Sequence, residues 1–310
     1  MRILITGGAG YIGSVLTKWL LDVGHSVTVL DNLYYDQDSL AGVCHYNKFE
    51  FLLGDVREEE LIKALLPVHD VIIPLACLVG ASVCERNKWL AKSINEDAIK
   101  LIDKHRSPNQ MLIFPTTNSG YGVGEDDKHC TEESPLNPIS FYGKTKVEAE
   151  RHLLDSGNVI TLRLATVFGV SPRMRTDLLV NDFVRRAMSD RVIVLFEEHF
   201  RRNYIYVRDV AWTFEYCMMN WDMLKNQVYN VGLSTANLTK RELAEKIKEH
   251  LIDLVLISSA IGADPDKRDY IVSNDKLEKT GWLPSYSLDD GIRELIKCYK
   301  VLRVNKYLNY

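Results

Sequence analysis

The sequence predicts an α/β fold, in which a doubly wound parallel sheet is joined to a smaller mixed α/β lobe. Two observations support this class. Short apolar runs alternate with helical patterns through the first half, as in a sheet built from strand–helix–strand units. After Gly169, longer helical segments mix with short strands. We therefore expect a first lobe over residues 1–169 and a second over 170–310, and we consider a return of the chain to the first lobe within 204–231.

The expected elements follow from apolar patterning and from the turn residues that bound each run. In the first lobe, strands are expected at Arg2–Thr6, Ser26–Asp31, Phe49–Gly54, Val71–Leu75, Met111–Thr116 and Val159–Ala165. Helices are expected between them at Ser14–Val23, Glu58–Leu66 and Lys88–Lys104. In the second lobe, expected helices are Asp177–Met188, Arg208–Asn220, Lys240–His250 and Leu288–Val301. The expected strands there are Val192–Leu195, Tyr204–Val207, Val228–Val231 and Leu254–Ser258.

A glycine-rich turn joins the first expected strand to the first helix. Gly7, Gly10 and Gly13 are spaced three residues apart, and Tyr11 and Ile12 lie between the last two. Such a turn leaves the first N–H groups of the helix unpaired and lets a diphosphate approach the backbone closely. These five residues predict a dinucleotide site of the Rossmann type.

A strand–turn–helix connection that binds no ligand also favours glycine. A second observation is therefore needed to indicate a dinucleotide site. Asp31 follows Gly13 by 18 residues, near the place where an acidic side chain accepts hydrogen bonds from the adenosine ribose. A carboxylate there repels a 2′-phosphate, and the residues that follow, beginning with Asn32, include no arginine to bind one. The predicted cofactor is therefore NAD rather than NADP, with Asp31 and Asn32 in its site.

The composition is that of an ordinary globular protein, with 46% hydrophobic and 26% charged residues. The formal net charge of −4 gives no sign of nucleic-acid binding, so individual arginines must meet an anionic ligand. The six cysteines are scattered without metal-ligand spacing, and no apolar run reaches membrane-spanning length. We expect no metal, no membrane association, no signal peptide and a reducing, cytoplasmic setting.

Tyr142 and Lys146 are the candidate catalytic pair. They are four residues apart in an expected helix, so they share one helix face. A lysine ammonium lowers the pKa of a nearby phenol, which would make Tyr142 a general base for a substrate hydroxyl as hydride leaves the same carbon. Thr117, at the carboxyl end of a strand, is placed to hydrogen-bond the same hydroxyl. The alternative is an exposed tyrosine, a solvated lysine and a self-bonded turn threonine without catalytic roles.

These motifs together resemble the extended short-chain dehydrogenase/reductases, and more narrowly the NAD-dependent nucleotide-sugar epimerase/dehydratase family. Besides the glycine turn, the similar segments are Asp31–Leu33, Gly54–Val56, Thr117–Gly122, Tyr142–Lys146, Arg163–Gly169, Arg202–Val210 and Leu277–Pro284. The resemblance therefore covers nearly the whole chain, including the second lobe.

The resemblance implies a role for each matching position. Tyr142 is the base, Lys146 binds the nicotinamide ribose, and Thr117 assists. The other implied cofactor contacts are Asp55 and Val56 at the adenine, Leu75, Ala76 and Cys77 along the middle of the cofactor, and Asn95 behind its nicotinamide half. The nucleotide-sugar contacts expected on the same basis are Thr117, Asn118, Ser119, Thr166, Arg173, Asn181, Arg202 and Arg268. Of these, Arg202 and Arg268 would bind the substrate diphosphate. The resemblance also implies a homodimer.

One departure from the family pattern argues against one of the reactions that the family catalyses. Dehydratases of the family carry Asp–Glu after the catalytic threonine, whereas this chain has Asn118 and Ser119, and neither transfers a proton at neutral pH. This argues against 4,6-dehydration. Epimerisation at C3 or C5 needs a second acid or base, for which His129 or Cys130 are candidates. Both lie in a polar loop without a visible partner, which favours an incidental role.

Within the family, residues 172–183 and 197–204 look most similar to bacterial GDP-manno-heptose C4 dehydrogenases of capsule-sugar pathways. The resemblance implies NAD-dependent oxidation at C4 of a GDP-manno-heptose or a related GDP-sugar. Two alternatives stay open. A UDP-hexose 4-epimerase would form a 4-keto sugar and reduce it again, and a non-catalytic NAD-binding sensor would use the cofactor site alone. The intact set of Tyr142, Lys146 and Thr117 argues against the sensor.

Overall fold

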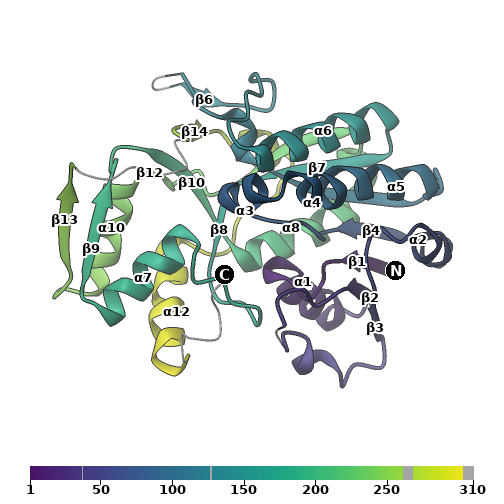
Figure 1. The fold of residues 1–310 in the computed structure, drawn as a ribbon, viewed down its shortest axis with the longest axis horizontal. Coiled ribbons are helices and arrows are strands. Elements are labelled where there is room, and N and C mark those ends of the chain that lie inside the picture. The colour runs from purple at the N-terminus through teal and green to yellow at the C-terminus, as the bar shows by residue number, and fades with distance from the viewer. Residues whose placement is uncertain (37, 126–127, 261–267, 303–310) are drawn as a thin grey trace.

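The computed structural model describes residues 1–36, 38–125, 128–260 and 268–302 (Figure 1). Within them, seven parallel strands form one large sheet in the order β11–β7–β5–β4–β1–β2–β3. These strands are β1 (Arg2–Thr6), β2 (Ser26–Asp31), β3 (Phe49–Leu53), β4 (Val71–Pro74), β5 (Met111–Thr117), β7 (Val159–Leu164) and β11 (Gln227–Val231). The predicted α/β class with a doubly wound parallel sheet is confirmed.

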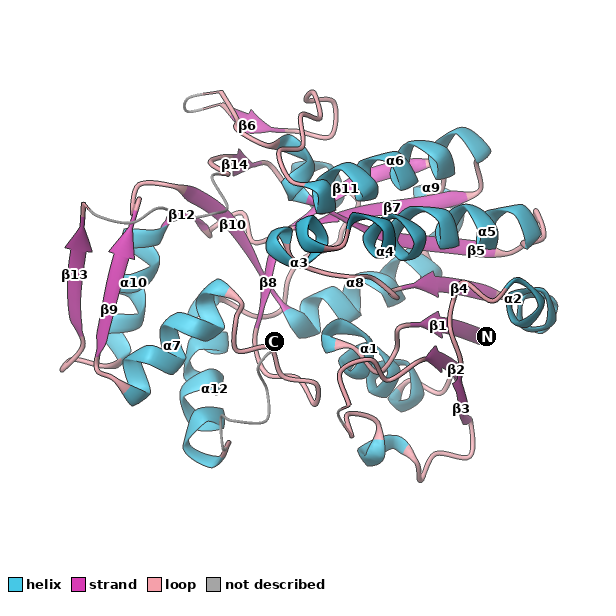
Figure 2. Ribbon diagram, in the orientation of Figure 1, coloured by secondary structure: helices cyan, strands magenta, loops and turns pink. Residues whose placement is uncertain are grey.

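Helices cover both faces of the large sheet (Figure 2). The covering helices are α1 (Tyr11–Asp22), α2 (Glu59–Leu65), α5 (Ala98–His105), α6 (Phe141–Ser156) and α8 (Val207–Met219). Ile3 and Ile5 of β1 pack in one apolar core with α1 and α8, whereas Leu4 packs in another with α2, α5 and α6. A parallel sheet buried on both faces needs such continuous apolar strands, which is why their positions could be predicted.

Smaller elements lie beyond the carboxyl edge of the large sheet (Figure 1). Their strands form a three-stranded sheet, β12–β10–β8, and two pairs, β13–β9 and β14–β6. The strands are β6 (His129–Cys130), β8 (Thr166–Phe168), β9 (Val192–Phe196), β10 (Arg201–Tyr206), β12 (Asn237–Thr239), β13 (Val255–Ser259) and β14 (Ile271–Val272). The larger helices among them are α7 (Leu179–Ser189), α10 (Lys240–His250) and α12 (Leu288–Val301).

Short helices complete the described elements. They are α3 (Ala81–Arg86), α4 (Lys88–Lys92), α9 (Trp221–Leu224), α11 (Asp275–Glu278), the 3-10 helices η1 (Ala41–Val43), η2 (Leu66–Val68) and η4 (Asn118–Tyr121), and the π-helical η3 (Ser93–Asp97). Most predicted elements are confirmed with small shifts of their ends, and the bounds of β1, β2, α10 and α12 are as predicted. The helix α1 begins three residues before the predicted start, and β10 likewise begins earlier, at Arg201.

The helix predicted over Lys88–Lys104 is confirmed as an unbroken helical run to His105, but a π-helical turn, η3, divides it into α4 and α5. Asn95, in the π-helical turn, is buried and faces the loop after β4. Its Oδ1 accepts a hydrogen bond from the N–H of Leu78 at 2.8 Å, and its Nδ2 donates to the Leu78 carbonyl at 3.0 Å. A π turn inserts an extra residue, which here accompanies the pairing of this amide with a loop backbone.

The strand β11 lies in the large sheet, although in the sequence it comes after β10, which belongs to the three-stranded sheet. It pairs in parallel with β7, from Gln227 opposite Ile160 to Val231 opposite Leu164. The preceding helix α8 packs beside α1, where the Trp19 indole N–H donates to the Glu215 carboxylate at 2.5 Å. The second half of the chain therefore supplies an edge strand and a covering helix to the large sheet.

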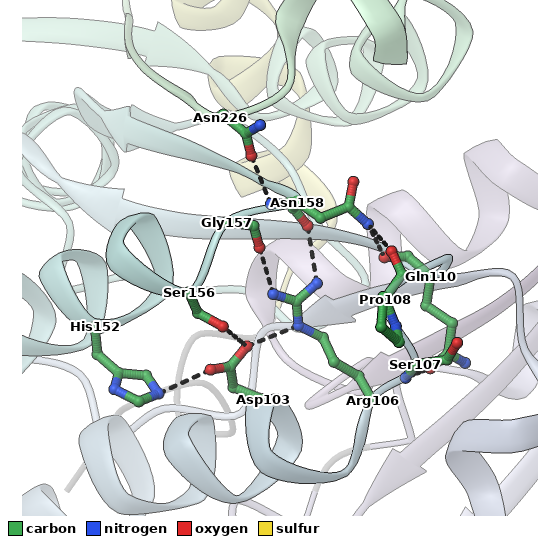
Figure 3. Close-up of polar contacts among 10 residues, drawn as sticks. All are labelled: Asp103, Arg106, Ser107, Pro108, Gln110, His152, Ser156, Gly157, Asn158 and Asn226. Atoms are coloured by element: carbon green, nitrogen blue, oxygen red, sulfur yellow. Dashed lines mark hydrogen bonds and ion pairs between the residues drawn. The ribbon is translucent and has the colours of Figure 1, made fainter.

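A polar cluster around Arg106 ties the loops that precede β5, β7 and β11 (Figure 3). Arg106 donates from Nε to Asp103 at 2.7 Å, and from its Nη atoms to the carbonyls of Asn158 at 2.9 Å and Gly157 at 2.5 Å. The Asn158 N–H in turn donates to the Asn226 side chain at 2.5 Å. These contacts fix the amino edge of the sheet, which is opposite the edge where the cavities lie.

Candidate active site

Two neighbouring cavities lie at the carboxyl edge of the large sheet. From β1, the strand order runs outward to β3 on one side and through β4 to β11 on the other. Open α/β sheets bind ligands where the order reverses in this way. The first cavity, of about 160 Å³, lies at the ends of β2, β3 and β4. The second, of about 480 Å³, lies between the ends of β1, β4 and β5, the helix α6 and the outer elements.

The glycine turn borders both cavities through Gly7 and Gly10, and Tyr11, Ile12 and Gly13 line the second. Gly7 has a φ of 75°, and a Cβ at this position would lie 2.4 Å from the Ala76 nitrogen. A Cβ on Gly13 would lie 2.5 Å from the Gly7 carbonyl oxygen. Gly7 is therefore required for the close approach of the turn to the loop after β4, and Gly13 for the close packing of α1 on the turn. Because no side chain caps α1, its N-terminus can accept an anion.

The first cavity contains the residues predicted for the adenosine half of NAD. Its walls include Asp31, Asn32, Asp55, Val56, Leu75, Ala76 and Cys77. Asp31 accepts hydrogen bonds from the backbone N–H groups of Ala9 at 2.9 Å and Leu33 at 2.8 Å. Burial raises the pKa of its carboxyl above the ordinary value, while these two N–H groups oppose the rise. The Asp31 side chain is thus held in place at the end of β2, as a ribose contact requires.

Asp55 is held by an arginine that the sequence analysis did not single out. Arg57 donates to its two carboxylate oxygens at 2.7 and 2.8 Å, and this contact lowers the pKa of Asp55 below its ordinary value. Asn32 also donates to Asp55, at 3.4 Å. The three side chains form a fixed polar wall of the first cavity.

Tyr142, Lys146 and Thr117 all line the second cavity. Ser140 caps the start of α6 by accepting a hydrogen bond from the Gly143 N–H at 3.1 Å, so the helix begins just before Tyr142. The Lys146 Nζ lies 3.9 Å from the centroid of the Phe114 ring. The Thr117 Oγ1 lies within hydrogen-bond distance, 2.9 Å, of the Ser119 hydroxyl. The structure therefore brings the three predicted catalytic residues to one cavity.

The protonation of Tyr142 depends mainly on its burial. Burial raises the pKa of its phenol above the ordinary value, with a contribution from Cys77, while Arg175 and Arg268 oppose the rise. Burial also lowers the pKa of the Lys146 ammonium. In the chain by itself, loss of solvation therefore outweighs the cations that would lower the pKa of Tyr142, and the expected effect of Lys146 on it stays a prediction.

Cations from the outer elements line the second cavity. Thr166, Arg173, Arg202 and Arg268 all line it, as predicted, together with Ser119. Arg268 donates to the Ser119 hydroxyl. The Arg202 guanidinium lies 5.7 Å from the Tyr270 ring centroid. Planar guanidinium groups in this position are suited to the paired oxygens of a diphosphate.

Three predicted contacts do not lie on either wall: Asn95, Asn118 and Asn181. Asn95 positions Leu78, as described above, and Asn118 is buried at 1% exposure. Asn181 accepts from the Gly169 N–H at 3.0 Å and donates to the Arg175 carbonyl at 2.8 Å. Its amide holds the loop between β8 and α7, and the predicted substrate contact at Asn181 stays a prediction.

His129 and Cys130 lie in the short strand β6, away from both cavities. Cys130 packs in a small apolar core with Tyr121, Tyr270 and Val272, and burial raises the pKa of its thiol. Within the described residues, no group of His, Cys, Asp or Glu side chains could hold a metal ion. In the same part of the chain, no helix has the length and apolar character needed to span a membrane.

Several cavity residues were missed by the sequence analysis. They are Tyr35, Arg57, Arg175, Asp177, Lys240 and Tyr270. Arg175 donates to Asp177 at 2.5 Å, and both line the second cavity. The unusual charge of residues 172–183 was the signal that could have identified these two. Tyr35 and Lys240 carry no motif that sets them apart.

Comparison with known proteins agrees with this site. Residues 3–232 match the model of the NAD dependent epimerase/dehydratase family. The chain is 28% identical to the low-salt glycan biosynthesis protein Agl12 of Haloferax volcanii, over 96% of this chain and 98% of that protein. It is 26% identical to the dTDP-glucose 4,6-dehydratase of Streptomyces niveus, over 97% and 93% of the two chains.

A solved structure shows that the similarity also holds for the fold. The UDP-glucose 4-epimerase of Thermus thermophilus, in complex with NAD, matches with a TM-score of 0.83 and 25% identity over 97% of this chain and 99% of that one. The region that matches the family model includes the glycine turn, Asp31, Thr117, Tyr142 and Lys146. The chain therefore belongs to the NAD-dependent epimerase/dehydratase family of the extended short-chain dehydrogenase/reductases, and it is an NAD-dependent enzyme.

Proposed function

We propose that this enzyme oxidises the C4 hydroxyl of a nucleotide-activated sugar, a GDP-manno-heptose or a related GDP-sugar, and releases the 4-keto product. One observation carries the proposal. The second cavity is lined by Tyr142, Lys146 and Thr117 and also by Arg202 and Arg268. A general base and two arginines around one cavity are suited to a hydroxyl-bearing substrate that also carries a diphosphate.

The chemical step is the removal of two hydrogens from one carbon and its oxygen. Tyr142 takes the hydroxyl proton while the C4–H bond breaks and its electron pair leaves as hydride, so that C4 and its oxygen become a carbonyl. Bound NAD⁺ supplies the hydride acceptor. Thr117 hydrogen-bonds the same oxygen, and the Lys146 ammonium stabilises the phenolate that Tyr142 needs as a base.

The residues after Thr117 support oxidation without dehydration. Asn118 is buried and lines neither cavity, and the Ser119 hydroxyl accepts a hydrogen bond from Arg268. Neither residue can act as the acid or base that elimination of water requires. The segment whose sequence favours a GDP-heptose contributes Arg175 and Asp177 to the second cavity, which supports a role for it in substrate choice.

A UDP-hexose 4-epimerase is the second candidate function. The structural likeness to the Thermus UDP-glucose 4-epimerase favours it. Such an enzyme would form the same 4-keto sugar and then return the hydride to its other face, so the two functions share the catalytic residues. They differ in whether the ketone leaves the cavity.

Product mass separates the two functions. We expect the purified enzyme, incubated with NAD⁺ and GDP-manno-heptose, to release a nucleotide sugar lighter by two hydrogen atoms. A product of unchanged mass and altered stereochemistry from UDP-glucose would support the epimerase instead. Loss of water from either substrate would contradict both.

Replacing Tyr142 by Phe tests the assignment of the base. We expect Tyr142→Phe to lower the rate of hydride transfer by roughly 10²- to 10⁴-fold, because proton removal is no longer assisted. NAD⁺ affinity, measured by calorimetric titration, should be retained. Tyr46→Phe is a matched control, since Tyr46 lines neither cavity. Unchanged turnover of Tyr142→Phe would overturn the mechanism.

A further inference from the structure

The two cavities share part of their walls, and this shared wall lies where the middle of a dinucleotide must pass. The residues that line both are Gly7, Gly10, Tyr35, Leu75, Cys77 and Arg173. Gly7 and Gly10 belong to the turn that is built to receive a diphosphate. Tyr35 and Arg173 belong to two loops far apart in the sequence, one after β2 and the other after β8.

Tyr35 and Arg173 are in direct contact across this wall. The carbon at the centre of the Arg173 guanidinium lies 4.1 Å from the centroid of the Tyr35 ring. Arg173 is only 2% exposed. Burial lowers its pKa, while the charges of Asp177 and Asp31 and the Tyr35 phenol favour its cationic form. A stacked, buried guanidinium has few alternative positions, so its charge is fixed beside the glycine turn.

We propose that Tyr35 and Arg173 form a clasp across the cofactor groove, in which Arg173 binds the diphosphate of NAD and Tyr35 holds its guanidinium in place. The glycine turn offers backbone N–H groups to the diphosphate from α1, and Arg173 adds a charged donor from the loop after β8. The clasp joins loops from opposite sides of the groove, so it slows the exit of the cofactor. Arg173 is thereby assigned to the cofactor rather than to the substrate.

The positions of the other arginines support this assignment. Among the described residues, the arginines that line a cavity are Arg57, Arg173, Arg175, Arg202 and Arg268, and only Arg173 lines both. Arg57 is bound to Asp55, and Arg175 is bound to Asp177. Arg202 and Arg268 are in the second cavity alone, where a second diphosphate, that of the substrate, would lie under the proposed function.

Cofactor exchange tests the clasp directly and does not require the substrate. Enzyme loaded with labelled NAD⁺ is mixed with an excess of unlabelled NAD⁺, and release of the label gives the dissociation rate. We expect Arg173→Ala to raise the dissociation constant roughly 10- to 100-fold, the range for one hydrogen bond to a charged group, mainly through faster dissociation. Tyr35→Ala should raise the dissociation constant of NAD⁺ by a smaller factor. Tyr35→Phe should bind NAD⁺ like the unaltered enzyme, because it keeps the ring.

A double variant and a control variant separate the clasp from a general loss of structure. The double variant should raise the dissociation constant of NAD⁺ by less than the product of the factors for Arg173→Ala and Tyr35→Ala, because both substitutions break the same contact. Arg208→Ala is the matched control. Arg208 also lies over a tyrosine, 5.6 Å from the Tyr206 ring centroid, but lines neither cavity, and its loss should leave NAD⁺ exchange unchanged.

Two further ligands distinguish a cofactor contact at Arg173 from a substrate contact. ADP-ribose, which has the diphosphate but lacks nicotinamide, should lose affinity for Arg173→Ala by the same factor as NAD⁺. GDP affinity, measured on NAD-loaded enzyme, should not change. If Arg173→Ala instead weakens GDP while NAD⁺ exchange stays within about two-fold of the unaltered enzyme, Arg173 is a substrate residue and the clasp is wrong. Arg173→Lys, which keeps the charge but loses the planar fork, gives the same comparison if the alanine variant fails to fold.

Discussion

At the scale of single residues, the proposed role of Tyr142 as the base would make its environment decide when hydride transfer can occur. Burial keeps its phenol neutral, because the pKa is raised above the ordinary value. A neutral phenol is a poor base, so the positive charge that favours the phenolate has to come from Lys146 together with the oxidised nicotinamide ring. The base is thus ready only when the cofactor is in the oxidised form that accepts hydride.

The charge of the nicotinamide ring leads to a cofactor-dependent titration of Tyr142. We expect its phenol to ionise at a lower pH in the complex with NAD⁺ than in the complex with NADH, since only NAD⁺ adds a positive charge. Because the ionised form is the base, hydride transfer should rise with pH through this pKa and then become constant. The measurement is the phenolate absorbance of each complex, with Tyr142→Phe subtracted. Equal titrations in both complexes would contradict the prediction.

Residue types and their spacing were enough to find the candidate residues whose positions are set by the local strand or helix. The glycine turn, Asp31 and the Tyr142–Lys146 pair could be found because strand ends and helix periodicity fix where they lie. The direction of the Asn181 side chain could not be found, because its amide turns toward backbone groups of Gly169 and Arg175 that the fold brings to it. The Tyr35–Arg173 contact was missed for the same reason, since no local pattern joins two such remote loops.

At the scale of elements, the contact between α1 and β1 depends on Gly13. A Cβ there would lie within 2.6 Å of both the Gly7 oxygen and the Gly8 Cα, which are backbone atoms that cannot move aside alone. We expect Gly13→Ala to destabilise the fold by about 1–3 kcal/mol, as overpacking typically does, and to weaken NAD⁺ binding. Urea unfolding and NAD⁺ titration measure the two effects. Gly42→Ala is the control, because a Cβ there meets no neighbouring atom within 4 Å.

The Arg106 cluster should contribute strongly to stability. The Arg106 and Asp103 side chains are 5% and 7% exposed, so removal of the arginine leaves two carbonyls without their donor and leaves the buried Asp103 with only Ser156 and His152 as partners. We expect Arg106→Ala to cost about 2–4 kcal/mol in the free energy of unfolding. Arg151→Ala, which breaks an exposed pair with Glu148, should cost under about 1 kcal/mol. Equal costs for both variants in chemical denaturation would show that the cluster has no special role.

The larger elements were predictable and the smaller ones were not, for a physical reason. A strand buried on both faces needs a continuous apolar run, and an amphipathic helix such as α10 shows its period over several turns. The strands β6, β8, β12 and β14 have only two or three residues each, too few for any period. The π turn in η3 depends on the Asn95–Leu78 contact, which is tertiary.

At the scale of the whole molecule, the expected homodimer remains to be tested. Trp89 of α4 is 74% exposed, which is unusual for so large an apolar side chain, and α4 packs beside α6. We expect a dimer by light scattering, and Trp89→Glu should convert it to a monomer. Ile252→Glu, at a similarly exposed residue far along the chain, should leave the dimer intact. A monomeric unaltered enzyme would contradict the expectation.

The return of β11 to the large sheet limits how this enzyme can be divided or recombined. A fragment of residues 1–169 would contain the glycine turn and the catalytic helix but would leave β7 as an open edge and α1 without α8. Unpaired N–H and C=O groups along an apolar strand invite pairing with another copy, so such a fragment is expected to aggregate. The cofactor half is therefore not a portable module, and exchange of substrate specificity between relatives has to preserve the residues that run from α8 through β11.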